Sequence, residues 1–221
     1  MTEDNIPIKQ RLHIEFGKMG ALKYTSNLDL AKIWERVLRR AGLPILYTQG
    51  FNARARIQLA SALPLGITSE CEILDVSLRE AVSLDGMIER LAAVSPAGLP
   101  IYKVIEVPVR SPALQTLVRS SEYRIQLEAD ADRRILEERI AALLSSETID
   151  TVRERKGRDV AVNVRPLIYD LYLDGNGDLI AHLAVGAQGN MRPDEIVELL
   201  GLTDRVYGVH RLRLHLDEPA T

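Results

Sequence analysis

Residues 11–42 read RLHIEFGKMGALKYTSNLDLAKIWERVLRRAG, and this stretch decides the fold. Residues 11–16 alternate between apolar and polar side chains, which predicts a strand with one buried face. Ser26, followed three residues later by Asp29, indicates a helix start, and the apolar residues behind it recur every three or four positions. Gly42 ends that helix. The chain therefore opens with a strand and a helix that share one core.

The rest of the chain continues this alternation of elements in two similar halves. In the first half we expect further strands at residues 45–47, 54–60, 72–78 and 101–107, and a helix at 84–94. In the second half we expect strands at residues 123–127, 179–185 and 206–216, a hairpin turning at 156–157, and helices at 135–144 and 193–200. The simplest account is an α+β chain of two tandem ferredoxin-like (βαββαβ) units with antiparallel sheets.

The prolines of the middle segment suggest where one unit ends and the next begins. We expect an N-terminal unit over residues 8–108, a linker over 109–120 and a C-terminal unit over 121–217.

Composition excludes several classes of protein. The chain has 221 residues, of which 46% are hydrophobic and 27% charged, as is ordinary for a globular protein. Its single cysteine, Cys71, allows no internal disulfide and no Cys-ligated zinc or iron–sulfur site built from this chain alone, so we expect no metal or cofactor. No apolar run approaches the ~20 residues of a membrane span, and the acidic N-terminus does not resemble a secretory signal. We therefore expect a cytoplasmic protein.

The net charge of −3 hides a strong asymmetry. Residues 9–66 carry ten Lys and Arg against three Asp and Glu, a balance of +7, whereas the rest of the chain carries −10. Such segregation favours an anionic partner for the first segment. The alternative is that the charges cluster by chance and neutralise each other.

The basic residues of the first segment form a pattern. Four of them lie within an arc of about 100° on the first helix, and Arg54 and Arg56, two apart in an extended segment, point to one face, which we expect beside the helix. The bend between them offers an aromatic ring and two amides, a combination typical of single-stranded RNA recognition. The predicted nucleic-acid-binding residues are Lys18, Lys32, Arg36, Arg39, Arg40, Gln49, Gly50, Phe51, Asn52, Arg54 and Arg56. The alternative is that Phe51 belongs to the core and Gly50 merely turns the chain.

A catalytic interpretation has less support. The sequence contains no glycine-rich phosphate loop, no His-Glu-x-x-His and no nucleophile elbow. None of the four histidines lies among these basic residues: they are His13, His182, His210 and His215. We therefore predict no catalytic residues and favour a binding protein over an enzyme.

Several motifs together resemble a known family. They are FGKMG at residues 16–20, YTSNLDL at 24–30, ERVLRRAGLP at 35–44, YTQGFN at 47–52 and LPLG at 63–66. This set resembles the radical SAM-linked proteins, an uncharacterised bacterial domain-of-unknown-function family found beside, or fused to, a cobalamin-binding radical SAM protein. The resemblance covers most of the chain and is densest over residues 11–78. It implies a radical SAM partner, which would supply the iron–sulfur cluster.

The chain departs from this family at two histidines. Asn27 stands where the family usually has the histidine of Ser-His-Leu-Asp, and Arg54 stands where it usually has that of Gly-Phe-Asn-Pro-His-Pro-Lys. Arg56 keeps the positive charge that closes the second motif. A binding role survives these changes better than a catalytic one.

Two functions stay open. The first is a non-catalytic accessory module that binds the substrate of a radical SAM partner, with RNA as the favoured substrate. The second is a stand-alone RNA-binding or RNA-processing protein, similar to the tandem ferredoxin-fold endoribonucleases that process CRISPR repeat transcripts, an analogy of fold alone.

Overall fold

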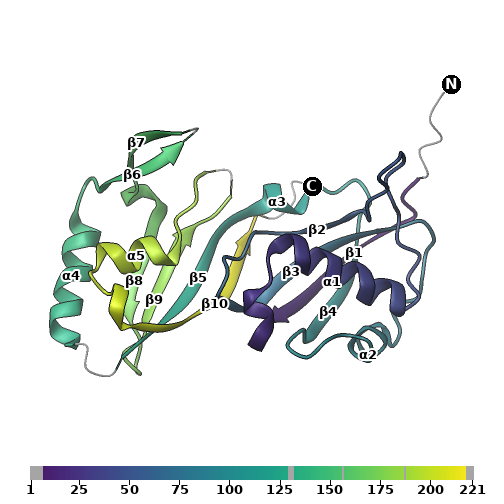
Figure 1. The fold of residues 1–221 in the computed structure, drawn as a ribbon, viewed down its shortest axis with the longest axis horizontal. Coiled ribbons are helices and arrows are strands. Elements are labelled where there is room, and N and C mark those ends of the chain that lie inside the picture. Colours follow the sequence, from purple (N-terminus) through teal and green to yellow (C-terminus); the bar gives the residue numbers. More distant parts are fainter. Residues whose placement is uncertain (1–6, 129–131, 156, 187, 218–221) are drawn as a thin grey trace. The chain divides into compact units, whose positions relative to one another are not determined.

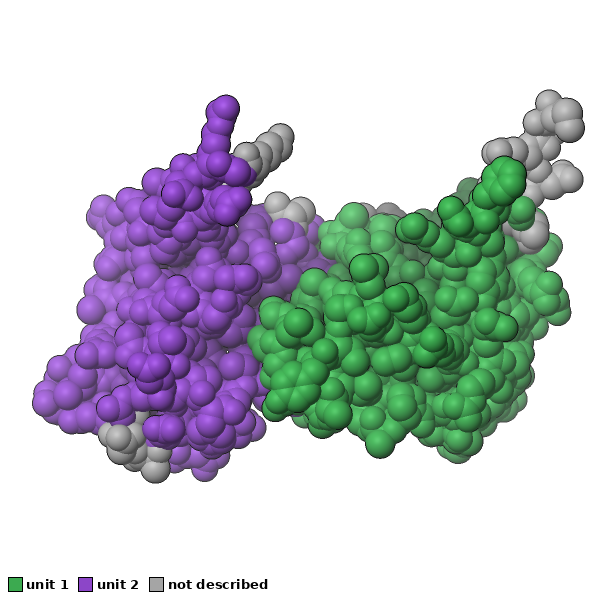
Figure 2. Space-filling model, viewed as in Figure 1, with its two compact units in different colours: residues 1–117, 217–221 green, residues 118–216 purple. Residues whose placement is uncertain are grey.

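The computed structural model describes residues 7–128, 132–155, 157–186 and 188–217 (Figure 1). Within them the chain is a mixed α+β protein with antiparallel strand pairs and few helices. The chain divides into two compact units, which Figure 2 colours separately. Unit 1 comprises residues 1–117 and 217–221, and unit 2 comprises residues 118–216. No helix of the described ranges has both the length and the apolarity that a bilayer crossing requires.

Unit 1 contains one antiparallel sheet with the strand order β4-β1-β3-β2. Its strands are β1 (Gln10–Lys18), β2 (Ile57–Leu59), β3 (Thr68–Leu78) and β4 (Ile101–Val107). Its helices are the 3₁₀ helix η1 (Gly20–Tyr24) and the α-helices α1 (Asn27–Arg40), α2 (Met87–Ala92) and α3 (Leu114–Leu117).

The core of unit 1 lies between one face of this sheet and the helices α1 and α2 (Figure 1). Leu12, Ile14 and Phe16 of β1 are fully buried, as their alternation predicts. Trp34 of α1 meets the Phe16 ring edge to face, with the ring centroids 4.8 Å apart. The predicted helix start is confirmed, because the Ser26 side chain accepts a hydrogen bond from the Asp29 backbone N–H at 3.1 Å.

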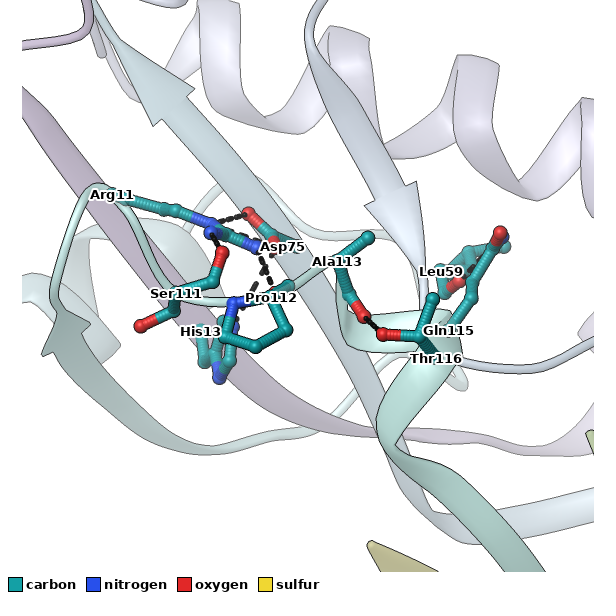
Figure 3. A network of polar contacts seen from close by, with 9 residues as sticks. All are labelled: Arg11, His13, Leu59, Asp75, Ser111, Pro112, Ala113, Gln115 and Thr116. Atoms are coloured by element: carbon teal, nitrogen blue, oxygen red, sulfur yellow. Dashed lines mark hydrogen bonds and ion pairs between the residues drawn. The ribbon is translucent and has the colours of Figure 1, made fainter. Parts of the chain in front are cut away.

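A buried ion pair occupies the other face of the sheet in unit 1 (Figure 3). Arg11 of β1 donates through Nε to both carboxylate oxygens of Asp75 of β3, at 2.9 and 3.0 Å, and its Nη2 also contacts Asp75. The same guanidinium donates to the backbone carbonyls of Ser111 and Pro112. Both side chains of the pair are less than one-tenth exposed. One arginine therefore links two strands and fastens residues 111–112 to the sheet.

The charge state of Asp75 follows from its neighbours. Burial alone would raise its pKa, but His13, whose Nε2 lies 3.6 Å from the carboxylate, and Arg11 outweigh that effect. The pKa of Asp75 is therefore lower than usual, and the carboxylate is charged at neutral pH.

Unit 2 contains an antiparallel sheet with the strand order β10-β5-β9-β8 and a separate two-stranded sheet. The main sheet consists of β5 (Val118–Leu127), β8 (Ile168–Leu173), β9 (Leu179–Ala184) and β10 (Val206–Leu216). The small sheet pairs β6 (Asp150–Arg155) with β7 (Arg158–Asn163). The helices are α4 (Arg133–Ser145), α5 (Pro193–Leu199) and the 3₁₀ turns η2 (Arg165–Leu167) and η3 (Thr203–Arg205).

The structure differs from the sequence-based expectations at several places. Residues 45–47 form only isolated bridges and not the predicted strand. Strand β8 was not predicted, because a register shift between Ile168 and Asp170 breaks its period of two. The predicted hairpin forms its own small sheet instead of joining the main one. Part of the expected linker is regular structure, since α3 and the first residues of β5 lie within residues 109–120.

The buried ion pair predicts an asymmetric response to mutation. Asp75→Ala leaves the Arg11 charge buried without its carboxylate and should lower the free energy of unfolding of unit 1 by about 3–5 kcal/mol at pH 7. The double variant Arg11→Met, Asp75→Leu removes both charges and should lose clearly less. Trp34, the single tryptophan of the chain and buried in unit 1, reports this transition by fluorescence in urea. Equal losses in the two variants would contradict the prediction.

A candidate nucleic-acid interface

Helix α1 presents a basic stripe to solvent. Its apolar face, made of Leu30, Trp34, Val37 and Leu38, is buried in the core of unit 1. Its opposite face carries the exposed side chains of Lys32, Arg36, Arg39 and Arg40. Lys32 lies 3.2 Å from the Asp29 carboxylate, whereas the three arginines make no ion pair with any residue in the described part of the chain. Three guanidinium groups are therefore free to meet an anion.

A hairpin over residues 46–56 presents an exposed aromatic ring. Tyr47 and Ala55 form an isolated antiparallel bridge, and the Thr48 N–H donates to the Arg54 carbonyl at 2.8 Å. The tip, residues 49–52, is exposed throughout and turns at Gly50, whose φ of +116° favours glycine. Phe51 is fully exposed to solvent. The alternative that Phe51 belongs to the core is therefore wrong, and its ring faces are open to solvent.

The base of this hairpin docks on α1. The Tyr47 hydroxyl donates to Glu35 Oε1 at 3.0 Å. Burial and the Glu35 carboxylate raise the pKa of this phenol, while the nearby Arg39 charge acts in the opposite direction. Arg39 therefore lies at the junction of helix and hairpin.

A hollow of about 450 Å³ opens at this junction. Arg39 lines it together with Thr48 and Gln49 of the hairpin and with Arg79, which follows β3 and which the sequence did not single out. Arg79 contacts only its exposed neighbour Glu80 among the described acidic residues, at 3.5 Å. We call the following set the basic surface: Lys32, Arg36, Arg39, Arg40, Arg79 and the tip residues Gln49, Gly50, Phe51 and Asn52.

Lys18 does not belong to this surface, and the prediction was wrong here. Strand β1 continues through Lys18 instead of ending at Phe16, and the lysine side chain is fully buried. Its Nζ donates to the Thr25 carbonyl at 2.9 Å. The preceding Gly17 is a packing requirement, because a Cβ there would lie 2.9 Å from Pro100 Cγ and 3.2 Å from the Ser69 backbone oxygen. This part of the FGKMG motif therefore has a structural explanation.

Arg54 and Arg56 do not join the stripe of α1 either, so the expected convergence was wrong. Ala55 and Ile57 pack against the core below α1, so their neighbours in this extended segment point to the other side. Arg56 lines a different hollow, together with Arg11 and Asp75. Strand alternation predicts one side of the segment for both arginines, but the sequence could not show which side faces the helix.

Sequence reasoning missed a histidine cluster in unit 2. His182 of β9 hydrogen bonds to the Ser120 hydroxyl of β5 at 2.8 Å, and His215 of β10 hydrogen bonds to Glu122 at 2.7 Å. The two imidazole centroids lie 4.9 Å apart. Only the pairing of β9, β5 and β10 brings these residues together, and no local sequence signal indicates it. In the described residues, no three His, Cys, Asp or Glu side chains are placed to hold a metal ion.

The surroundings of His182 affect its protonation. Burial, followed by the proximity of His215, lowers the pKa of His182, while Glu122 and Asp170 act in the opposite direction. His182 is therefore biased toward its neutral form.

Comparison with known proteins identifies a family and distant structural neighbours. A family model described as "Uncharacterized protein conserved in bacteria (DUF2344)" matches residues 11–193. No curated protein matches the chain. A chain in the solved "Crystal Structure of a Cbf5-Nop10-Gar1 Complex" is similar with a TM-score of 0.46 and 10% sequence identity, covering 92% of this chain and 48% of that one. The chain thus spans about half the length of this neighbour.

The histidine cluster predicts a pH dependence of stability. Because the pKa of His182 is lower in the folded state, unfolding takes up protons, and the stability that this residue contributes is lost as the pH falls through about 6.5, the ordinary histidine value. His182→Gln should therefore reduce the drop in melting temperature between pH 7.5 and pH 5.5, measured by calorimetry. His210→Gln, on the same sheet, is the control. An unchanged pH dependence in His182→Gln would refute the assignment.

Proposed function

The chain belongs to the uncharacterised bacterial family whose model it matches, and from its geometry we propose that it is a binding module for a polyanion, with RNA as the class that fits best. Arginines without an ion pair supply the charge that phosphates require. The observation that carries the proposal is Phe51, a fully exposed ring on a hairpin that docks beside those arginines. An aromatic face stacks on any base, so the combination suits a single strand.

The strand orders support a finer description of the fold within this proposal. Unit 1 has the strand order β4-β1-β3-β2, and unit 2 has the order β10-β5-β9-β8. In both units the first and third strands along the chain lie at the centre of the sheet, and the fourth and second lie outside them. A βαββαβ chain of the ferredoxin-like kind has this order. We therefore propose two tandem ferredoxin-like units, with β6 and β7 as an insertion in the second. The segment between them falls within residues 109–120.

The proposal assigns the chain an accessory role beside a radical SAM protein. This part rests on the resemblance of its motifs to the radical SAM-linked proteins. The chain has one cysteine, so the partner would hold the iron–sulfur cluster. In this arrangement the basic surface presents the substrate, and the chemistry is done by the partner.

One observation favours the alternative of a stand-alone RNA-processing protein. His182 and His215 form a pair of imidazoles on one sheet, and one of them is biased toward its neutral form. Such a pair can serve as base and acid. Cleavage of RNA by the purified chain, lost in His182→Gln, would favour this alternative over the accessory role.

Charge reversal on α1 tests the binding proposal. About four phosphate contacts to a single strand give a slope near −3 for log affinity against log salt concentration. Arg39→Glu combined with Arg40→Glu should weaken binding to all single-stranded RNA sequences alike and flatten the slope by about half. The matched control is Arg133→Glu with Arg134→Glu, which reverses two adjacent exposed arginines on α4. Fluorescence anisotropy with a labelled oligoribonucleotide measures both quantities, and equal effects of the two pairs would contradict the proposal.

The exposed ring gives a second, separable effect. Phe51→Ala should weaken RNA binding by about 1–3 kcal/mol through lost stacking and leave the salt slope unchanged. Its melting temperature should stay that of the wild type, because the ring contributes nothing to the core. Tyr207→Ala, which removes an exposed aromatic from unit 2, is the control. If neither Phe51→Ala nor the double variant Arg39→Glu, Arg40→Glu changes the affinity for RNA, the basic surface is a docking site for a protein.

A further inference from the structure

A second hollow lies on the face of the unit 1 sheet that is opposite to α1. Its volume is about 370 Å³. We call it the Arg56 hollow, and its lining residues are Ile8, Arg11, Arg56, Ile57, Gln58, Asp75, Ser77, Ser111 and Ala113. Figure 3 shows Arg11 and Asp75 next to the segment from Ser111 to Ala113, with dashed lines from Arg11 to Ser111 and Pro112. The hollow shares no lining residue with the one beside α1.

The polar groups of the Arg56 hollow include unused donors. The exposed guanidinium of Arg56 makes no ion pair in the described ranges. The Gln58 amide and the Ser77 hydroxyl make no side-chain hydrogen bond to another described residue. A guanidinium, an amide and a hydroxyl are the groups that bind a tetrahedral oxyanion.

The single carboxylate of the hollow does not oppose an anion. Asp75 is neutralised by Arg11, whose Nε and Nη2 both contact it. The backbone carbonyls of Ser111 and Pro112 hold this guanidinium in place from the other side. The Arg56 charge is therefore left in excess, and the floor of the hollow is fixed before any ligand arrives.

The rest of the lining indicates what the anion is attached to. Ile8 and Ala113 supply an apolar wall. A volume of about 370 Å³ exceeds the need of a bare phosphate ion and lies at the lower end of the range for small-molecule sites. The ligand thus combines a compact organic body with an anionic group.

We propose that the Arg56 hollow binds a phosphate monoester of nucleotide size, with its phosphate on Arg56, Gln58 and Ser77 and its body against Ile8 and Ala113. A free nucleotide and the phosphorylated end of an RNA chain present the same chemistry. Binding of an RNA end rests on the proposed function, whereas binding of a free nucleotide does not.

The test uses the full chain and uridine 5′-monophosphate as the probe. Titration calorimetry should show binding of this nucleotide and at least about tenfold weaker binding of uridine, because charged hydrogen bonds to the phosphate are lost. Arg56→Gln should weaken nucleotide binding about tenfold, and Ser77→Ala should weaken it to a smaller degree. Arg54→Gln, which removes a neighbouring exposed arginine outside the lining, should change it less than twofold. Trp34 fluorescence checks that each variant is folded.

Two further arms separate this site from the basic surface. The variant Arg39→Glu, Arg40→Glu should bind the nucleotide as the wild type does, even if it no longer binds RNA. A 5′-phosphorylated oligoribonucleotide that binds more tightly than its 5′-hydroxyl form, with the gain lost in Arg56→Gln, assigns the hollow to an RNA end. Equal binding of the two oligonucleotides, with the nucleotide still bound, assigns it to a free phosphate monoester. No nucleotide binding, or binding unchanged in Arg56→Gln, overturns the proposal.

Discussion

The contact between Arg11 and Asp75 is the constraint on which the arrangement of unit 1 depends. It joins β1 to β3 on the open face of the sheet, while the apolar residues of the same two strands build the core on the other face. The arginine also binds the carbonyls of residues 111–112, so one side chain fixes the segment that leads out of the unit. A desolvated guanidinium is stable only when its donors are used, and this geometry uses them.

The two faces of this sheet consequently have different chemistry. The α1 face is filled with apolar side chains, and its outer layer is the basic stripe with the hairpin beside it. The open face is polar and holds the ion pair and the Arg56 hollow. Arg39 lies on the solvent side of α1, whereas strand alternation around Ala55 places Arg56 on the open face of the sheet. Unit 1 therefore has two cationic regions of different shape. The basic surface is long and open, and the Arg56 hollow is compact and enclosed by its lining residues.

How much the sequence could predict depended on how local the signal was. Strand β4 and helix α1 were predicted almost to the residue, because alternation and the Ser26 cap are local signals. Strand β8 escaped because its bulge interrupts the alternation. Lys18 was misplaced because nothing local shows that β1 extends two residues further into the interior. The basic stripe was readable from one helix, whereas the Arg56 hollow and the histidine cluster depend on which strands pair.

The exposed hairpin tip has a consequence for how this protein can evolve. Its bridge and backbone hydrogen bonds lie at its base, and its four tip residues add nothing to the core. Apart from the turn at Gly50, replacements there do not compete with folding, so packing does not explain why the tip carries Gln49, Phe51 and Asn52. The stability of the fold therefore places no demand on the chemistry of these side chains, and another selective pressure has to decide which residues stand there.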